Sequence, residues 1–308
     1  MFTREELTAI SKRIKEHSII KRTLMSSFKG LVLNEKDHVY TINGNKLTST
    51  SKYISQFEAT SFNPHIISHG VTRGQNKKVY EQRPYLSELS SEFLLNKNQV
   101  LVRYKLMADQ AIAMGNRVHY FSEMYPFFIK AHCDQEDAVF QWFKKYLGPD
   151  SKYVYIGSEL RIFDPNTQKG GTIDLLLYNT KTKKLVICDW KTNHKSLLMG
   201  YKGQKLTGPF SHLINCPYTK YSLQLSDYKN MIEMNTDFEV EDMFIIHLYP
   251  VALDYMSKYK NKSSYIFFKD YLLKAKTPKY TLLKALDLTQ GLKDSYQTLS
   301  NKNNKPAF

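Results

Sequence analysis

Two apolar segments joined by a short polar turn constrain the fold of this chain more than any other feature. The first runs from Gly171 to Tyr178 and the second from Leu185 to Trp190, and both have the apolar content and length of β-strands. A turn over residues 179–184 would make the two strands an antiparallel pair. The three leucines that follow Asp174 indicate that this pair lies in a buried sheet.

Charged residues interrupt both strands. Asp189 and Lys191 flank Trp190, so their side chains lie on one face of the second strand. Asp174 on the first strand can approach Asp189 across the pair. Two close carboxylates attract a hard divalent cation such as Mg²⁺, and a neighbouring ammonium can steer water or stabilise an anionic oxygen. This combination suits the cleavage of a phosphodiester.

The same charges have simpler structural interpretations. Asp174 follows a glycine-rich turn, where an aspartate often bonds only to its own backbone. Asp189 and Lys191 can form a buried ion pair with no chemical role. An unpaired carboxylate is costly in so apolar a sheet, and that cost favours a functional interpretation of all three residues.

The charge of the chain indicates a polyanionic partner. Its 308 residues carry a formal net charge of +15, and they include 22 Tyr and 17 Phe that could stack on bases. Nucleic acid is therefore the expected partner, although lysines that merely solubilise the surface would give the same balance. Three widely spaced cysteines favour a reducing compartment, and they fall short of the four thiolates of an ordinary iron–sulfur cluster.

The expected location is cytoplasmic, in a bacterial or infected host cell. No apolar run approaches the ~20 residues of a membrane span, which argues against a membrane partner. The N-terminus lacks the apolar segment of a signal peptide, so we do not expect secretion.

The wider pattern predicts an α/β fold. Thr3 and Glu6 form a capping box that predicts a helix start, and Asn43-Gly44 predicts a type I′ turn between two short strands. Helices are expected over 88–130 with a break near 96–99, over 135–146 and over 221–234, strands over 153–163, 171–178, 185–190 and 243–249, and a loop over 63–84. The tail is expected to be partly helical and to fray after Leu299. We expect a mixed central sheet flanked by helices, divided into an N-terminal helix and hairpin region (1–100), a core (101–255) and a basic Lys/Tyr-rich extension (256–308).

Five short motifs follow one another along residues 105–250. They are Gly115-Asn-Arg-Val-His119, Glu159, Gly171-Thr-Ile-Asp174, Asp189-Trp-Lys191 and Gln224-Leu-Ser-Asp-Tyr228. Each motif is weak alone, but their order and their strand–strand–helix context are specific. Together they resemble the PD-(D/E)XK nuclease superfamily, and within it the RecB-like exonuclease branch of phage and viral type. The resemblance implies a restriction-endonuclease-like sheet with helical additions at the N- and C-terminal ends.

The resemblance also implies a role for each motif. The metal ligands would be His119, Asp174, Asp189 and the main-chain carbonyl of Trp190. The ion would be Mg²⁺ or Mn²⁺, without an iron–sulfur cluster. Lys191 would orient the attacking water or stabilise the developing phosphate charge. Gln224 and Tyr228 lie one helical turn apart on the same face, where they would contact DNA and support the metal site.

Two further assignments have both a functional and a structural interpretation. Glu159 is either a ligand or supporting group at the same centre, or an outward residue of an edge strand. A long basic loop precedes Gln224 and carries Lys195, Lys202 and Lys205. This loop would either be flexible and guide a DNA strand to the metals, or be an ordinary solvated surface loop.

The expected activity is hydrolysis of DNA phosphodiester bonds by a metal-dependent exonuclease acting on DNA ends, in recombination, repair or viral and phage genome processing. A structure-selective endonuclease acting on flaps or single strands would use the same centre. A non-catalytic nucleic-acid-binding protein on a decayed nuclease fold is the third alternative, and the complete set of Asp174, Asp189 and Lys191 argues against it. The motifs are compatible with either digestion polarity, with DNA or RNA, and with a monomer or an oligomer.

Overall fold

The structure is a computed structural model that describes residues 2–35, 37, 39–59, 64–65, 68, 96–125, 130–193, 197–200, 203–248 and 280–303, apart from the side chains at 103 and 297–303. Contacts divide the chain into two compact units, one of Met1–Ala59 with Arg117–Phe308 and the other of Thr60–Asn116. The candidate site lies in the first unit, which is the one described below. The division of the chain into residues 1–100, 101–255 and 256–308 stays a prediction.

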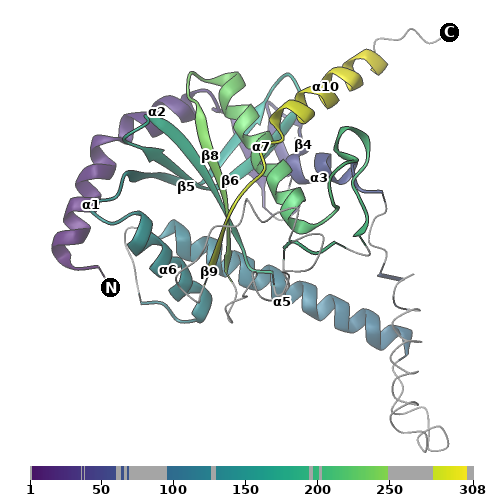
Figure 1. The fold of residues 1–308 in the computed structure, drawn as a ribbon, viewed down its shortest axis with the longest axis horizontal. Helices are drawn as coiled ribbons and strands as arrows, with labels where there is room; N and C mark the ends of the chain where they lie inside the picture. The colour runs from purple at the N-terminus through teal and green to yellow at the C-terminus, as the bar shows by residue number, and fades with distance from the viewer. Residues whose placement is uncertain are drawn as a thin grey trace, which may run out of the picture. The chain divides into compact units, whose positions relative to one another are not determined.

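The first unit contains both helices and strands (Figure 1). The helices are α1 (Arg4–Glu16), α2 (Ser18–Ser26), α3 (Thr50–Ser55), the last residues of α5 (Lys97–Glu123), α6 (Asp134–Tyr146), α7 (Pro217–Asn235) and α10 (Thr289–Asn303), with a 3₁₀ turn at Gly208–Phe210. The strands are β1 (Leu31–Asn34), β2 (Val39–Ile42), β3 (Asn45–Lys46), β4 (Thr48–Ser49), β5 (Tyr153–Asp164), β6 (Lys169–Asn179), β7 (Lys184–Lys191), β8 (Val240–Leu248) and β9 (Tyr280–Lys284). The fold is therefore of the mixed α/β class.

The central sheet is mixed and has six strands. Its path is β4-β6-β7-β8-β9, and β5 pairs with the other edge of β6. β5, β6 and β7 form consecutive antiparallel pairs, whereas β8 lies parallel to β7. The return from β7 to β8 passes through α7, because a parallel neighbour needs a long crossover connection. A separate three-stranded sheet has the order β1-β2-β3.

Helices cover both faces of the central sheet (Figure 1). Lys191 on β7 contacts Tyr221 of α7, whereas Trp190 contacts Trp142 and Phe143 of α6. Neighbouring side chains of a strand point to opposite faces, so α7 and α6 pack on opposite sides of β7. The core on the α7 side is formed by apolar side chains of the sheet and of that helix, among them Leu176, Leu185, Ile187, Leu223, Met231 and Ile245.

Most of the predicted elements are confirmed. In α1, the Glu6 amide donates to Thr3 Oγ1 and the Thr3 amide donates to the Glu6 carboxylate, as a capping box requires. Asn43 and Gly44 have φ angles of 49° and 80°, the left-handed values of a type I′ turn. The predicted helix over 135–146 and all four predicted strands are present with small shifts at their ends.

Other expectations were wrong or incomplete. α7 begins at Pro217, four residues before the predicted start, because proline suits the first turn of a helix. α10 continues to Asn303, past the fraying predicted after Leu299, and the strand β9 was not expected. Most of the predicted 63–84 loop and the start of the 88–130 helix lie outside the described residues. Among the helices that the structure describes, none combines the length and apolar content needed to cross a membrane.

Candidate active site

The candidate site lies where β4 and β7 separate along one edge of β6, at residues 171–174; this place is called the β6 fork. β4 occupies this edge at Lys169 and Gly170, and β7 occupies it from Leu175 onward. Between them, residues 171–174 have no ladder partner on this edge among the described strands. The amide of Trp190, two residues beyond the last residue of β7 that pairs with β6, donates to Asp174 Oδ2 at 2.9 Å. Asp174 is thereby held at the fork, beside the end of β7.

His119, Glu159 and Asp174 converge at this fork from three different elements. His119 belongs to the end of α5, Glu159 to β5 and Asp174 to β6. Nδ1 of His119 lies 2.7 Å from Glu159 Oε1, and its Nε2 lies 3.6 Å from Asp174 Oδ2. One ligand atom from each residue lies within 4.8 Å of the other two. An imidazole and two carboxylates form a donor set that could hold a divalent metal ion.

The backbone of Glu159 explains why its side chain reaches His119. Glu159 has a φ of 49°, which is uncommon for a residue other than glycine. Its neighbours pair regularly, Ser158 with Leu175 and Leu160 with Ile173, and a bulge lies just before them between Tyr155 and Gly157. Strained backbone of this kind costs roughly 1–3 kcal/mol and persists only where surrounding contacts hold it. The contact with His119 favours a ligand or supporting role for Glu159 over that of a plain outward residue.

Asp189 and Lys191 form a buried ion pair beside this group. Lys191 Nζ lies 2.9 Å from Asp189 Oδ1 and 2.7 Å from Oδ2, and the two side chains share a face as predicted. Asp189 is 1% exposed and Lys191 16% exposed. The Asp189 carboxylate therefore faces the ammonium, and it is not one of the three residues whose ligand atoms converge. Metal ligation by Asp189 and by the Trp190 carbonyl stays a prediction.

The balance of burial and neighbouring charges raises the pKa values of His119, Asp189 and Lys191. Burial alone would lower the pKa of His119, but Asp174 and Glu159 outweigh it and raise this pKa to about 9. Burial raises the pKa of Asp189 to about 7; the Lys191 ammonium lowers this pKa and the Asp174 carboxylate raises it. For Lys191, the attraction of Asp189 and Asp174 overcomes burial and raises the pKa. All three shifts show that these groups hold their protons tightly in the metal-free protein, and a bound cation would compete with those protons.

Gln224 and Tyr228 are placed on α7 as the sequence predicts. Gln224 Nε2 donates to the Tyr228 hydroxyl at 2.9 Å, so the two side chains share one helix face. The Tyr228 ring packs directly on Gly171 of β6, where a Cβ atom would lie 2.3 Å from ring atom Cε1. Glycine at 171 is therefore what allows Tyr228 to sit against the strand that carries Asp174.

Three site residues were missed by the sequence analysis. The Lys191 ammonium lies 4.4 Å from the centre of the Tyr221 ring, and the Tyr221 hydroxyl donates to Asn193 Oδ1 at 3.2 Å. His247 Nε2 lies 2.7 Å from the Asn193 carbonyl oxygen. Tyr221 could have been found, because it precedes Gln224 by three residues and so shares its helix face. His247 carries no such signal, since its position depends on the parallel register of β7 and β8.

The basic loop differs from its prediction. Lys195 and Lys202 lie outside the described residues, Lys205 is exposed, and the ammonium of Lys220 lies 3.3 Å from the Glu58 carboxylate. The described parts, 197–200 and 203–216, supply buried side chains to the core: Leu197, Leu198, Leu206, Phe210 and Leu213. These apolar side chains anchor the described parts of the loop in the core, and guidance of a DNA strand by its lysines stays a prediction.

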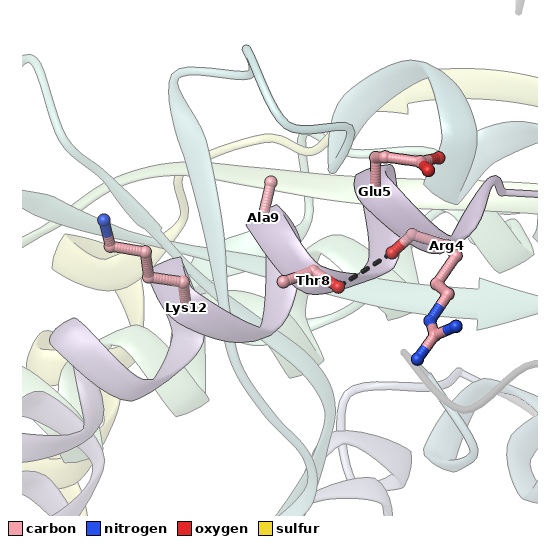
Figure 2. Close-up of a pocket in the computed structure, with 5 residues that line it drawn as sticks. All are labelled: Arg4, Glu5, Thr8, Ala9 and Lys12. Atoms are coloured by element: carbon pink, nitrogen blue, oxygen red, sulfur yellow. Dashed lines mark hydrogen bonds between the residues drawn. The ribbon is translucent and has the colours of Figure 1, made fainter.

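A shallow hollow along α1 lies apart from these motifs (Figure 2). It is lined by Arg4, Glu5, Thr8, Ala9 and Lys12, and its only drawn bond is the local one from Thr8 Oγ1 to the Arg4 carbonyl at 2.8 Å. None of the predicted site residues lines it, so it does not compete with the β6 fork as a candidate site.

No protein-family model matches this chain, and no curated protein matches it. The resemblance to PD-(D/E)XK nucleases therefore stays a prediction from the five sequence motifs.

Proposed function

We propose that this protein is a metal-dependent deoxyribonuclease of the PD-(D/E)XK type, most similar to RecB-like exonucleases that act on DNA ends. One observation carries the proposal: His119, Glu159 and Asp174 converge at the β6 fork, beside the Asp189–Lys191 pair. Chance would not be expected to bring four separately weak motifs to one point of a sheet. The antiparallel β5-β6-β7 unit followed by a helix and a parallel β8 supports a restriction-endonuclease-like fold.

The donor set fits a hard divalent ion. His119, Glu159 and Asp174 would hold Mg²⁺ or Mn²⁺, with Asp189 close enough for its charge to contribute. When bound, such an ion lowers the pKa of a coordinated water and neutralises charge on the scissile phosphate.

The protein's own side chains would supply positioning and charge. Lys191 remains an ammonium, which can orient the attacking water or offset the negative charge that develops on phosphate. Gln224 and Tyr228 would contact the strand from α7. The net charge of +15 would supply affinity that does not depend on sequence and falls steeply with salt.

The proposal is tested by incubating the purified protein and its Asp174→Ala variant with linear DNA and Mg²⁺ or Mn²⁺. Asp150→Ala is the matched control, because Asp150 is an exposed aspartate of the same unit. We expect the wild type and Asp150→Ala to degrade DNA and Asp174→Ala to be inactive. Equal behaviour of all three proteins would refute the proposal. Cleavage of a covalently closed circle would indicate a structure-selective endonuclease, because an exonuclease needs an end.

A further inference from the structure

Arg161 occupies the strand on the other side of Asp174 from Lys191. β6 carries Asp174 and lies between β5, which carries Arg161, and β7, which carries Lys191. Arg161 pairs with Thr172, two residues before Asp174. Side chains that oppose each other in an antiparallel pair are neighbours, and the next position on the same face lies about 7–8 Å away, within reach of an arginine.

The surroundings of Arg161 are those of the candidate site. Thr172, its ladder partner, has its hydroxyl 2.9 Å from the Tyr40 hydroxyl. Arg161 interacts electrostatically with Tyr40 and with Glu123, and both of these also interact with Glu159. The guanidinium therefore belongs to the same cluster of charges as the proposed metal ligands.

The ion pair that Arg161 makes is a weak one. Its Nη2 lies 3.2 Å from Glu35 Oε1, with Arg161 39% exposed and Glu35 80% exposed. Ion pairs this exposed contribute little, since water and salt screen them. An exposed carboxylate in a single-contact pair can be displaced by a better acceptor, and a phosphate accepts two parallel bonds from a guanidinium.

We propose that Arg161 binds a phosphate group of the DNA strand at the β6 fork, and that Glu35 pairs with the guanidinium when no DNA is bound. The identity of the ligand rests on the proposed nuclease function. Arg161 and Lys191 then hold the strand from both sides of Asp174, which aligns the backbone along the carboxylates. The phosphate is either one of the backbone or one at the end of the strand, and the same guanidinium chemistry serves both.

Binding without cleavage tests this site directly. Fluorescent duplexes are titrated with wild-type protein, Arg161→Ala, Arg161→Lys and Arg4→Ala, in EDTA. Arg4 is the control because it is an exposed arginine on α1 that lines the hollow of Figure 2. We expect Arg161→Ala to raise Kd about tenfold and to reduce the salt dependence by about one phosphate contact, with Arg161→Lys in between. Arg4→Ala should stay within about twofold of wild type.

Glu35→Gln should change the Kd for DNA in the opposite direction. It removes the carboxylate that competes with phosphate and leaves Arg161 in place, so it should lower Kd about two- to threefold. Circular dichroism and thermal melting of each variant separate lost binding from lost folding. The inference would be overturned if the Kd of Arg161→Ala equalled that of Arg4→Ala, or if Glu35→Gln raised Kd.

Two duplexes, with and without terminal phosphates, distinguish the source of the ligand. A defect of Arg161→Ala that persists on dephosphorylated ends identifies a backbone phosphate, whereas a defect confined to phosphorylated ends identifies a terminal one. Either result supports the site. Because binding is measured without metal, it also separates the two proposals. A binding defect in Arg161→Ala, together with a wild type that cleaves no DNA, would support the phosphate site and refute the nuclease. DNA cleavage by wild type, together with unchanged binding by Arg161→Ala, would support the nuclease and refute the phosphate site.

Discussion

Replacing Gly171 by alanine should disturb the candidate site without touching any of its charged residues. The added Cβ atom would lie 2.3 Å from Cε1 of Tyr228 and 2.9 Å from its hydroxyl oxygen. Real side chains do not approach this closely, so the strand or the tyrosine must move. Tyr228 is 4% exposed and its hydroxyl accepts a bond from Gln224, which leaves the ring little room to move.

The magnitude follows from the kind of contact. Overpacking of a well-packed interior costs about 1–3 kcal/mol, and loss of the Gln224 bond adds about 1 kcal/mol. We therefore expect Gly171→Ala to lower the free energy of unfolding by about 2–4 kcal/mol, and to lower cleavage because Tyr228 is displaced from the fork. Gly115→Ala is the control: its new Cβ would meet no described atom within 4 Å, and alanine stabilises a helix by about 0.8–1.0 kcal/mol over glycine.

Urea unfolding in EDTA measures both variants, and a double-mutant cycle tests the cause. With Tyr228 replaced by leucine, the added methyl group at 171 has space, so the cost of Gly171→Ala should fall to less than half. An unchanged cost in the Tyr228→Leu background would refute the steric account, since the destabilisation would then arise from the strand itself.

Three further outcomes follow from the same structure. Lys169→Met should lower the free energy of unfolding by about 3–5 kcal/mol, measured in urea, because it leaves the buried Asp227 carboxylate without its ammonium partner. Tyr221→Phe should keep kcat within about twofold, whereas Tyr221→Leu should lower kcat about tenfold at unchanged KM, because the ring of Tyr221 and not its hydroxyl contacts the Lys191 ammonium; equal kcat values in steady-state cleavage assays would contradict this. The His119 pKa of about 9 lies above its ordinary value, so the stability it contributes to the metal-free protein is complete below about pH 6.5 and lost as the pH rises through 9. Urea unfolding of wild type and His119→Gln across this range should converge at high pH, and a constant difference would contradict the assignment.

Local patterns were sufficient to predict much of the fold. The continuous apolar runs of β6 and β7 and the positive-φ pair Asn43-Gly44 each encode their structure within a few residues. β4 has only two residues, Thr48–Ser49, and exists because it meets the start of β6 far along the chain. β9 likewise depends on its pairing with β8. Such elements are set by non-local contacts, which no short window of sequence contains.

The site shows the same division. The order and spacing of the motifs predicted which side chains would gather at the site, and the alternation of side chains along a strand placed Asp189 and Lys191 on one face. They left open whether Asp189 would pair with Lys191 and whether Glu159 would join His119, because the position of the Glu159 side chain depends on the left-handed backbone at that residue. A backbone conformation held by tertiary contacts has no signature in the residue that adopts it.

The most direct test of the central claim is a time course on linear duplex DNA labelled at either end, beside a covalently closed circle, with Mg²⁺ or Mn²⁺. The proposed function predicts that wild-type protein degrades the linear DNA progressively from an end, spares the circle, and loses this activity in Asp174→Ala and in EDTA. Intact linear DNA under all metal conditions, or loss of DNA that is identical in wild type and Asp174→Ala, would contradict the assignment of the β6 fork as a nuclease centre.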